Sequence, residues 1–215
     1  MHKLTLTFDN GPEPQITGEV LDILRRHRLR TSFFVLGQKL VEPARRSLAE
    51  RAHAEGHWIG NHTYSHSIPL GLCQEPDAPE SEIGRTQELL GELAHPNRWF
   101  RPIGGGALDR RLLSPAALDY IVRNRYSCVL WNCVPRDWAE PERWAATAYA
   151  EIQLRPWTLM VLHDLPTGAM NYLDAFIERL TKARIEIVQE FPPDCVPIVN
   201  GQIVRPIDAY VSPPA

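Results

Sequence analysis

Five short segments of the sequence carry polar side chains whose types and spacing suit the hydrolysis of an amide bond. They contain Asp9 and Asn10, the pair His62 and His66, Arg101, Asp137, and His163. Amide hydrolysis needs an activated water, a polarised carbonyl group and a proton for the leaving nitrogen. Two histidines separated by three residues can share one face of a helical turn and bind one metal ion. A carboxylate and a protonated imidazole supply the base and the acid.

Each of the five segments lies just after a predicted β-strand. Strand-like and helix-like patterns alternate in about seven repeats, which is typical of a parallel sheet with helical crossovers. We expect strands at residues 3–8, 31–36, 58–60, 99–101, 128–131, 158–162 and 185–188, separated by helices at 15–27, 43–55, 80–93, 115–124, 141–154 and 171–183. A closed barrel and an open doubly wound sheet both fit this order. In a barrel the carboxyl ends of the strands converge on one face, so the five segments would meet there.

Local signals mark the ends of several elements. Ser114 is placed to cap the helix that starts at the following proline. Gly56 suits the left-handed position that often follows a helix. Residues 196–204 indicate a C-terminal β-hairpin around an Asn-Gly turn. Residues 72–80 contain two prolines and are expected to form a surface loop.

The composition limits the partners of the chain. It has 215 residues and a formal net charge of -3. The length predicts one domain over residues 1–215, and the charge argues against nucleic acid or an anionic membrane as a partner. No apolar run is long enough to cross a membrane, and no secretory signal is visible, so a cytoplasmic enzyme is expected. The four cysteines form no Cys-x-x-Cys pair, which favours buried, reduced thiols.

In this order and approximate spacing, the five segments resemble the motifs of the polysaccharide deacetylase family, the NodB-homology or carbohydrate esterase 4 domain. Two motifs are intact, HTYSH at residues 62–66 and LHD at residues 162–164. The first motif reads TFDNGP, with Asn10 where the family usually has aspartate. The third, RPIGG from Arg101, lacks the second proline and the tyrosine of the family. The fourth keeps only its last aspartate, Asp137, and the tryptophan that follows.

The resemblance implies a distorted (β/α)7 barrel that hydrolyses N-acetyl or O-acetyl groups with a divalent metal. In the family's scheme, Asp9 would be the general base and His163 the general acid. Arg101 would hold Asp9, and Asp137 would tune this acid–base set. The backbone N–H of Gly104, where the family often has tyrosine, would help to stabilise the oxyanion.

The resemblance also implies a metal site formed by Asn10, His62 and His66, with Asn10 in place of an aspartate ligand. Zn²⁺ is the expected ion, with Co²⁺ and Ni²⁺ as alternatives. An asparagine offers only a neutral carbonyl oxygen, so the site lacks an anionic ligand unless Asp9 contributes. We therefore expect the metal to bind weakly.

Three functions compete on this basis. The leading one is metal-assisted acid–base removal of an acetyl group from an N-acetylated sugar or a related small amide. The second is a metal-independent C–N hydrolase that opens a cyclic amide or imide. The third is an inactive carbohydrate-binding module; the presence of both Asp9 and His163 argues against it, because binding alone would not need that pair. The substrate is expected to be a saccharide or another small molecule, selected by loops such as 67–80 and 104–113.

Overall fold

Strand β1 (Lys3–Asp9) lies at the centre of the fold and pairs with three parallel neighbours. Strand β6 (Trp157–His163) runs beside it along its full length. Strand β2 (Ser32–Val35) pairs with its C-terminal end, and β7 (Glu186–Val188) pairs with its N-terminal end. Every residue of β1 after the first is buried, as expected for a strand covered on both faces.

The computed structural model describes residues 2–213, and the strands within this range form a single sheet. The remaining strands are β3 (Trp58–Asn61), β4 (Trp99–Phe100), β5 (Ser127–Cys128), β8 (Ile198–Val199) and β9 (Gln202–Ile203). Their order is β6-β1-β2-β3-β4-β5-β8-β9, with β7 beside β1. Neighbours from β6 to β5 are parallel, whereas β8 runs antiparallel to both β5 and β9.

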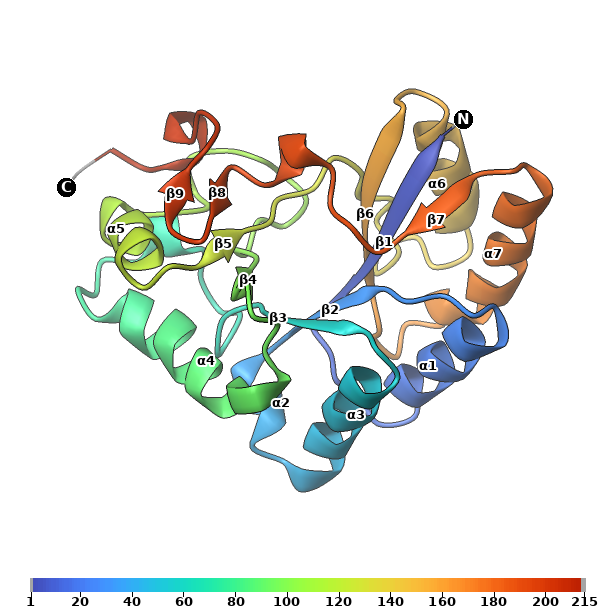
Figure 1. The fold of residues 1–215 in the computed structure, drawn as a ribbon, viewed down its shortest axis with the longest axis horizontal. Helices are drawn as coiled ribbons and strands as arrows, with labels where there is room; N and C mark the ends of the chain where they lie inside the picture. The colour runs from blue at the N-terminus through green and yellow to red at the C-terminus, as the bar shows by residue number, and fades with distance from the viewer. Residues whose placement is uncertain (1, 214–215) are drawn as a thin grey trace.

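The sheet curves into a distorted barrel (Figure 1). After β5 the chain turns toward β6, where Cys133 forms an isolated β-bridge with Met160. The N–H of Cys133 donates to the Leu159 carbonyl over 3.1 Å. Irregular backbone therefore closes the ring between β5 and β6. The fold is the distorted (β/α)7 barrel that the resemblance implied, followed by the expected hairpin β8–β9. The turn residues of this hairpin, Asn200 and Gly201, have positive φ angles of 48° and 78°.

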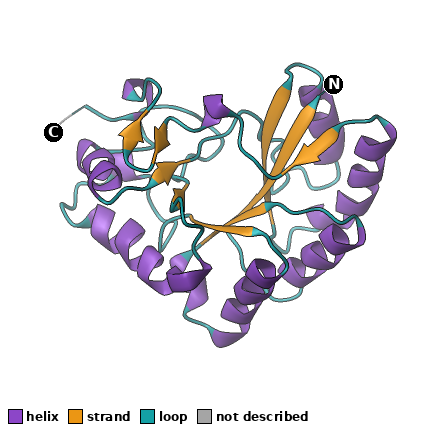
Figure 2. Cartoon of the chain, viewed as in Figure 1, coloured by secondary structure: helices purple, strands orange, loops and turns teal. Residues whose placement is uncertain are grey.

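Helices cover the outside of the strands (Figure 2). The α-helices are α1 (Ile16–Arg26), α2 (Gly37–Leu40), α3 (Pro43–Ala54), α4 (Arg85–Leu90), α5 (Pro115–Arg123), α6 (Trp144–Ile152) and α7 (Leu173–Lys182). Ser114 caps α5 as expected, because its hydroxyl accepts a hydrogen bond from the Ala117 N–H. The buried faces of α1, α3, α6 and α7 belong to one apolar core with the outer side chains of β1 and β6.

Alternation along β1 decides which side chains face the interior of the barrel. Leu4, Leu6 and Phe8 belong to the outer core that the helices cover. The side chains between them must then face inward, because successive side chains of a strand point to opposite faces. Thr7 and Asp9 are thereby placed inside the barrel.

Strand β6 repeats this pattern beside β1. Met160 and Leu162 belong to the outer core, so His163 faces inward. Asp9 and His163 are register partners at the carboxyl ends of the two strands. The two inward-facing candidates are thus fixed side by side by the pairing of the two longest strands.

Most predicted elements are present, with ends that differ by a few residues. The predicted strand 128–131 is shorter, because the Leu130 N–H bonds to the Cys195 carbonyl instead of continuing the ladder with β4. The predicted helix 80–93 is irregular: it begins as a π-helical segment η2 (Glu80–Gly84), continues as α4 and ends in a 3-10 turn (Gly91–Leu93). The sequence did not predict α2, since one helical turn is too short to show a periodic pattern.

The four cysteines are free, and Cys128, Cys133 and Cys195 are buried. Cys73 is only partly buried, so the expectation of buried thiols is wrong for this residue. Burial raises the pKa of Cys195 to about 11 and that of Cys128 to about 12, which makes these two thiols poor nucleophiles at neutral pH.

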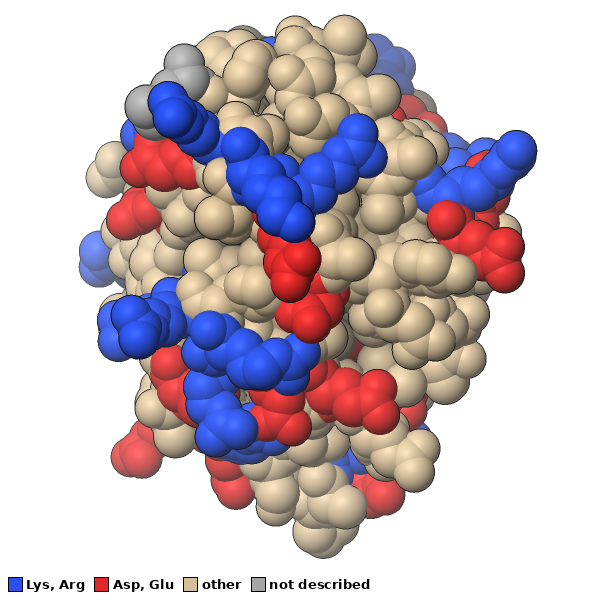
Figure 3. Space-filling view, turned by 90° about the vertical axis from the view of Figure 1, so that its right-hand side faces the viewer, with Lys and Arg blue, Asp and Glu red and all other residues tan. Residues whose placement is uncertain are grey.

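Basic and acidic side chains lie interspersed on the face of the molecule that Figure 3 shows. On α1, Arg25 pairs with Asp22 and Arg26 pairs with Asp174, each over 3.2 Å. The basic cluster of α1 is therefore a solvated helix face with acidic partners. Within residues 2–213, no helix combines the length and the hydropathy that crossing a bilayer requires.

Candidate active site

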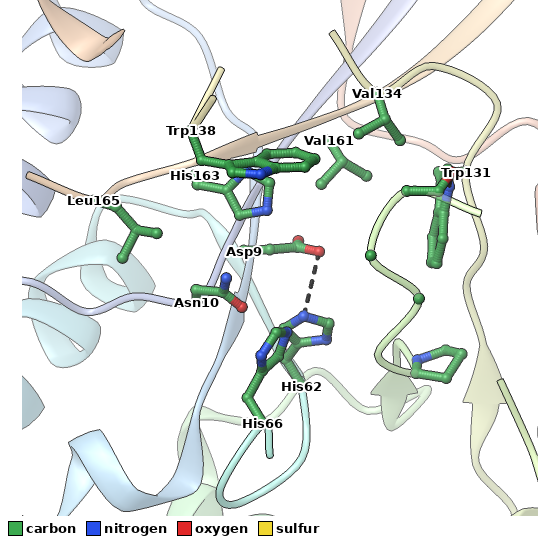
Figure 4. A pocket seen from close by; sticks show the side chains of 14 residues that line it. Asp9, Asn10, His62, His66, Trp131, Val134, Trp138, Val161, His163 and Leu165 are labelled. Carbon is green, nitrogen blue, oxygen red and sulfur yellow. Dashed lines mark hydrogen bonds and ion pairs between the residues drawn. The ribbon is translucent and has the colours of Figure 1, made fainter. Parts of the chain in front are cut away.

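The structure places all eight predicted site residues in or against one cavity of about 350 Å³ at the carboxyl ends of the strands. Figure 4 shows the residues that line this cavity. Six of the eight line it directly: Asp9, Asn10, His62, His66, Gly104 and His163. Arg101 and Asp137 are fully buried behind the cavity, and each bonds one lining side chain. Five segments far apart in the sequence therefore form one site.

Asp9 is held by a buried guanidinium. Nη1 of Arg101 donates to Asp9 Oδ1 over 2.8 Å and to Thr7 Oγ1 over 2.7 Å. The guanidinium also lies over the ring of Phe34, 4.0 Å from its centroid. Burial lowers the pKa of Arg101, and the charge of Asp9 opposes that decrease. The pair leaves Oδ2 of Asp9 as the oxygen that faces His62, 3.6 Å from Nε2 (Figure 4).

His163 is oriented by Asp137 through two hydrogen bonds. Nδ1 of the imidazole lies 2.8 Å from Asp137 Oδ1, and the backbone N–H of His163 donates to Oδ2 over 2.8 Å. Burial alone would lower the pKa of His163, but the hydrogen bond and charge of Asp137, with smaller contributions from Asp9 and Asp164, raise it on balance. The imidazole therefore keeps its proton to a higher pH, and Nε2 remains for the cavity side.

His62 and His66 present neutral imidazoles on the opposite wall. Nδ1 of His62 lies 2.8 Å from the Arg101 carbonyl oxygen, so it donates there and leaves the lone pair of Nε2 free. The two rings are 4.9 Å apart between centroids. Burial is the main reason why the pKa of His62 falls to about 3, and the charge of Arg101 lowers it further. Burial and the neighbouring His62 take the pKa of His66 to about 3.

Asn10 supplies an oxygen beside these two histidines. Its Oδ1 is buried and has no hydrogen-bond partner among the described residues. A buried polar atom without a partner costs free energy of roughly 1–3 kcal/mol, so it calls for a ligand. Within residues 2–213 no three His, Cys, Asp or Glu side chains form a metal cluster. The amide oxygen of Asn10 and the two imidazole nitrogens would together make a donor set that fits a divalent ion.

Two of these side chains come from strained backbone. Asn10 has a φ of 73° and His66 a φ of 55°. Asparagine tolerates the left-handed region, whereas histidine adopts it less readily. Such strain costs on the order of 1–3 kcal/mol and persists only where the surroundings enforce it. Positive φ at two residues that face the same cavity is consistent with a functional constraint.

Gly104 begins a loop of three glycines on the cavity wall. A Cβ at this position would lie 2.4 Å from the ring of Trp131, so only glycine fits there. In the described part of the chain, the N–H groups of residues 104–106 donate no hydrogen bond to protein atoms. They are therefore available to an oxygen of a ligand in the cavity.

The sequence pattern missed several residues of the site. Thr7 could have been found, because it precedes Asp9 by two residues on the same face of β1. Trp131 and Val134 line the cavity from irregular backbone, for which no periodic signal exists. Asp164 was recognised as part of the LHD motif but was given no role. It is fully buried beneath the first motif, where it accepts a hydrogen bond from Thr17, and burial raises its pKa to about 7.

Comparison with known proteins agrees with the family that the sequence motifs resemble. The model of the family described as polysaccharide deacetylase matches residues 2–121. A chitooligosaccharide deacetylase of Rhizobium leguminosarum bv. phaseoli is 34% identical over 165 residues, which cover 75% of this chain and 67% of the relative. A peptidoglycan-N-acetylglucosamine deacetylase of Bacillus cereus is 29% identical over 183 residues, covering 83% of this chain and 63% of the relative.

Solved structures give the same result. A family 4 acetyl xylan esterase from Clostridium thermocellum, in complex with a cobalt ion, superposes with a TM-score of 0.71 at 27% identity. The match covers 86% of this chain and 87% of that chain. Together with the fold, these relatives define the class of the protein as a hydrolase that removes acetyl groups. Within that class, this chain belongs to the polysaccharide deacetylase family.

Proposed function

We propose that this protein removes the acetyl group from an N-acetylated saccharide by acid–base catalysis assisted by a divalent cation. The observation that carries the proposal is the pairing of Asp9 with Arg101 and of His163 with Asp137 at one cavity. One pair presents a carboxylate, and the other keeps an imidazole protonated. Two ionisable groups that differ in this way serve as base and acid at one pH. The deacetylase relatives support a saccharide as the substrate class.

In this mechanism Asp9 acts as the general base. Arg101 holds Oδ1, so Oδ2 is the oxygen that accepts a proton from the attacking water. As the water adds to the acetyl carbon, negative charge develops on the carbonyl oxygen. The N–H of Gly104 stabilises this charge in the cavity, where water is partly excluded.

His163 acts as the general acid. Its Nε2–H transfers a proton to the sugar nitrogen as the carbon–nitrogen bond breaks, which releases acetate and a free amine. Asp137 keeps the imidazolium oriented and charged until that step. Because Asp9 and His163 are register partners on adjacent strands, base and acid flank the same small volume.

His62, His66 and Asn10 are the residues that would hold the cation, and Zn²⁺ is the ion that this donor set favours. When bound, a divalent cation supplies Lewis-acid polarisation of the carbonyl and lowers the pKa of a water from about 16 toward roughly 7. The low pKa values of both histidines keep their nitrogens unprotonated, and so able to bind a cation, at neutral pH.

The neutral amide of Asn10 favours one alternative, a cation-free hydrolase of a cyclic amide or imide. Asp9 is the one carboxylate lining the described cavity, and Arg101 already engages its Oδ1. A weak cation site would suit an enzyme that does not depend on the ion. Turnover of a cyclic imide that persists in excess chelator, without turnover of acetylated sugars, would establish this alternative.

The test uses acetate release from a chitooligosaccharide with added Zn²⁺. Asp9→Asn and His163→Ala should each lower kcat by on the order of 10²–10⁴-fold, the usual size of an acid–base contribution. Circular dichroism should show that both variants remain folded. His53→Ala and Asp119→Asn, which change exposed residues of the same types, should retain full activity. Near wild-type kcat in either site variant would refute the assignment.

A further inference from the structure

His66 lies in a loop that is held by hydrogen bonds from neighbouring elements. Residues 63–66 form neither helix nor strand, and both Thr63 and His66 have positive φ angles. His62 is oriented by the hydrogen bond from its Nδ1 to the Arg101 carbonyl. In the described structure no other residue hydrogen-bonds the His66 ring. The position of His66 therefore depends on what holds the backbone before it.

One carboxylate accepts hydrogen bonds from the N–H groups of the two residues before His66. Oε2 of Glu82 accepts hydrogen bonds from the N–H groups of Tyr64 and Ser65, each over 2.9 Å. Its Oε1 accepts a third bond from the Ser65 hydroxyl over 2.7 Å. Carboxylate acceptors form charge-assisted hydrogen bonds that are about twice as strong as neutral ones. The two residues immediately before His66 are thus tied to one side chain.

The position of Glu82 is set by the π-helical segment η2. The hydroxyl of Thr86 donates to the Glu82 carbonyl over 2.9 Å. Three residues after Glu82, at the start of α4, the guanidinium of Arg85 lies over the Tyr64 ring, 3.7 Å from its centroid. Glu82 and Arg85, which lie on one continuous helical segment, therefore both contact the loop. Irregular π-helical turns of this kind occur frequently at functional sites.

The other side of the loop is held by α2. The N–H of Gly37 donates to the Thr63 carbonyl over 3.0 Å, and the N–H of Gln38 donates to the Tyr64 carbonyl over 3.1 Å. These bonds engage the carbonyl groups, whereas Glu82 engages the N–H groups. Without Glu82, the N–H groups of Tyr64 and Ser65 would lose their acceptor, and the loop would keep only the bonds to its carbonyl groups on this side.

We infer that Glu82 is a positioning residue for His66, acting through the N–H groups of Tyr64 and Ser65. The inference rests on the proposed function, in which His66 helps to hold a cation. Outer residues that orient metal ligands typically change metal affinity by about 10–100-fold when they are replaced. Glu82 does not line the cavity, so its effect should reach the site only through the loop.

The test measures Zn²⁺ affinity by calorimetry and amide exchange by NMR, on the full chain. Glu82→Ala should weaken Zn²⁺ binding by on the order of tenfold or more, and exchange at the Tyr64 and Ser65 amides should accelerate. Glu82→Gln keeps an oxygen for the two N–H groups, so it should recover most of the affinity. Ser65→Ala removes one of the three bonds and should give a small loss. Glu88→Gln removes the same charge from an exposed residue of α4 and should have no effect.

Each other outcome contradicts a specific step. Faster amide exchange in Glu82→Ala with unchanged Zn²⁺ affinity would make Glu82 structural only. Equal losses in Glu82→Ala and Glu82→Gln would assign the effect to charge and overturn the positioning role. Failure of the wild-type protein to bind Zn²⁺ would remove the cation from the proposed function and this inference with it. That case is distinguished by the wild-type titration alone.

Discussion

At the scale of single residues, Asp137 determines up to which pH His163 keeps its proton. The pKa of His163 is raised above its ordinary value of 6.5 because the bond and charge of Asp137 outweigh the effect of burial. A general acid works only while it is protonated, so kcat/KM should fall as the pH rises through the pKa of His163. The alkaline limb of the profile therefore reports this imidazolium.

Asp137→Asn should move that limb to lower pH. Asparagine still accepts a hydrogen bond but carries no charge, so the imidazolium loses its main stabilising partner while burial continues to disfavour it. The measurement is kcat/KM for deacetylation between pH 5 and 10, with the exposed Asp119→Asn as the control. An alkaline limb at the same pH in both variants would show that His163 is not the acid.

Asn10 determines the affinity of the proposed cation site. An aspartate at this position would add a negative charge to a donor set that now has neutral ligands. Asn10→Asp should tighten Zn²⁺ binding by on the order of tenfold or more, since one Coulomb interaction at about 4 Å contributes about 1–4 kcal/mol. Calorimetric titration in one buffer compares it with wild type and with the exposed Asn171→Asp. Equal affinities would mean that residue 10 is not a ligand.

The residues of the site differ in how far the sequence predicts them. Asp9 and His163 lie on the two longest strands, where local alternation and a following turn reveal the inward face. Glu82 could not be found in this way, because its bonds cross 17 residues and depend on the register of a π-helical segment. The unpartnered oxygen of Asn10 is likewise a property of three-dimensional packing.

At the scale of elements, β1 joins the core to the site. Its outward side chains pack under the helices, and its inward side chains reach the cavity. Elements with a strong periodic pattern were predicted well, whereas β5 ends at Cys128, before most of its apolar run. The reason is that the chain after β5 bonds first to Cys195 and then to β6, and long-range pairing of this kind leaves no local signal.

The outer face of β1 should affect stability and leave the chemistry unchanged. Leu6 is fully buried in the outer core, so Leu6→Ala should lower the free energy of unfolding by about 2–5 kcal/mol. Leu154→Ala, at a side chain that is 75% exposed, should change it by less than about 0.5 kcal/mol. Denaturant unfolding measures both. Below the transition, kcat per folded molecule should be the same for the two variants, because Leu6 points away from the cavity.

At the scale of the whole molecule, the site joins parts of the chain that are far apart. Asn10 follows β1, whereas His62 and His66 follow β3. A cation held by all three would link these segments in the folded state only. Binding to the native state stabilises it by an amount that depends on the ratio of ligand concentration to Kd. Thermal unfolding can therefore report the site without any substrate.

Zn²⁺ at about 100 times its Kd should stabilise the wild-type protein by about 2.7 kcal/mol, which raises Tm by roughly 5–10 °C for a domain of this size. Chelator should reverse the shift. His66→Ala should abolish it, whereas the exposed His53→Ala should retain it. An equal shift in both variants would place the ion on surface histidines instead. If no variant responds to Zn²⁺ and turnover continues in chelator, the carboxylate of Asp9 and the imidazole of His163 act without a cation, and the cation-free hydrolase becomes the better description.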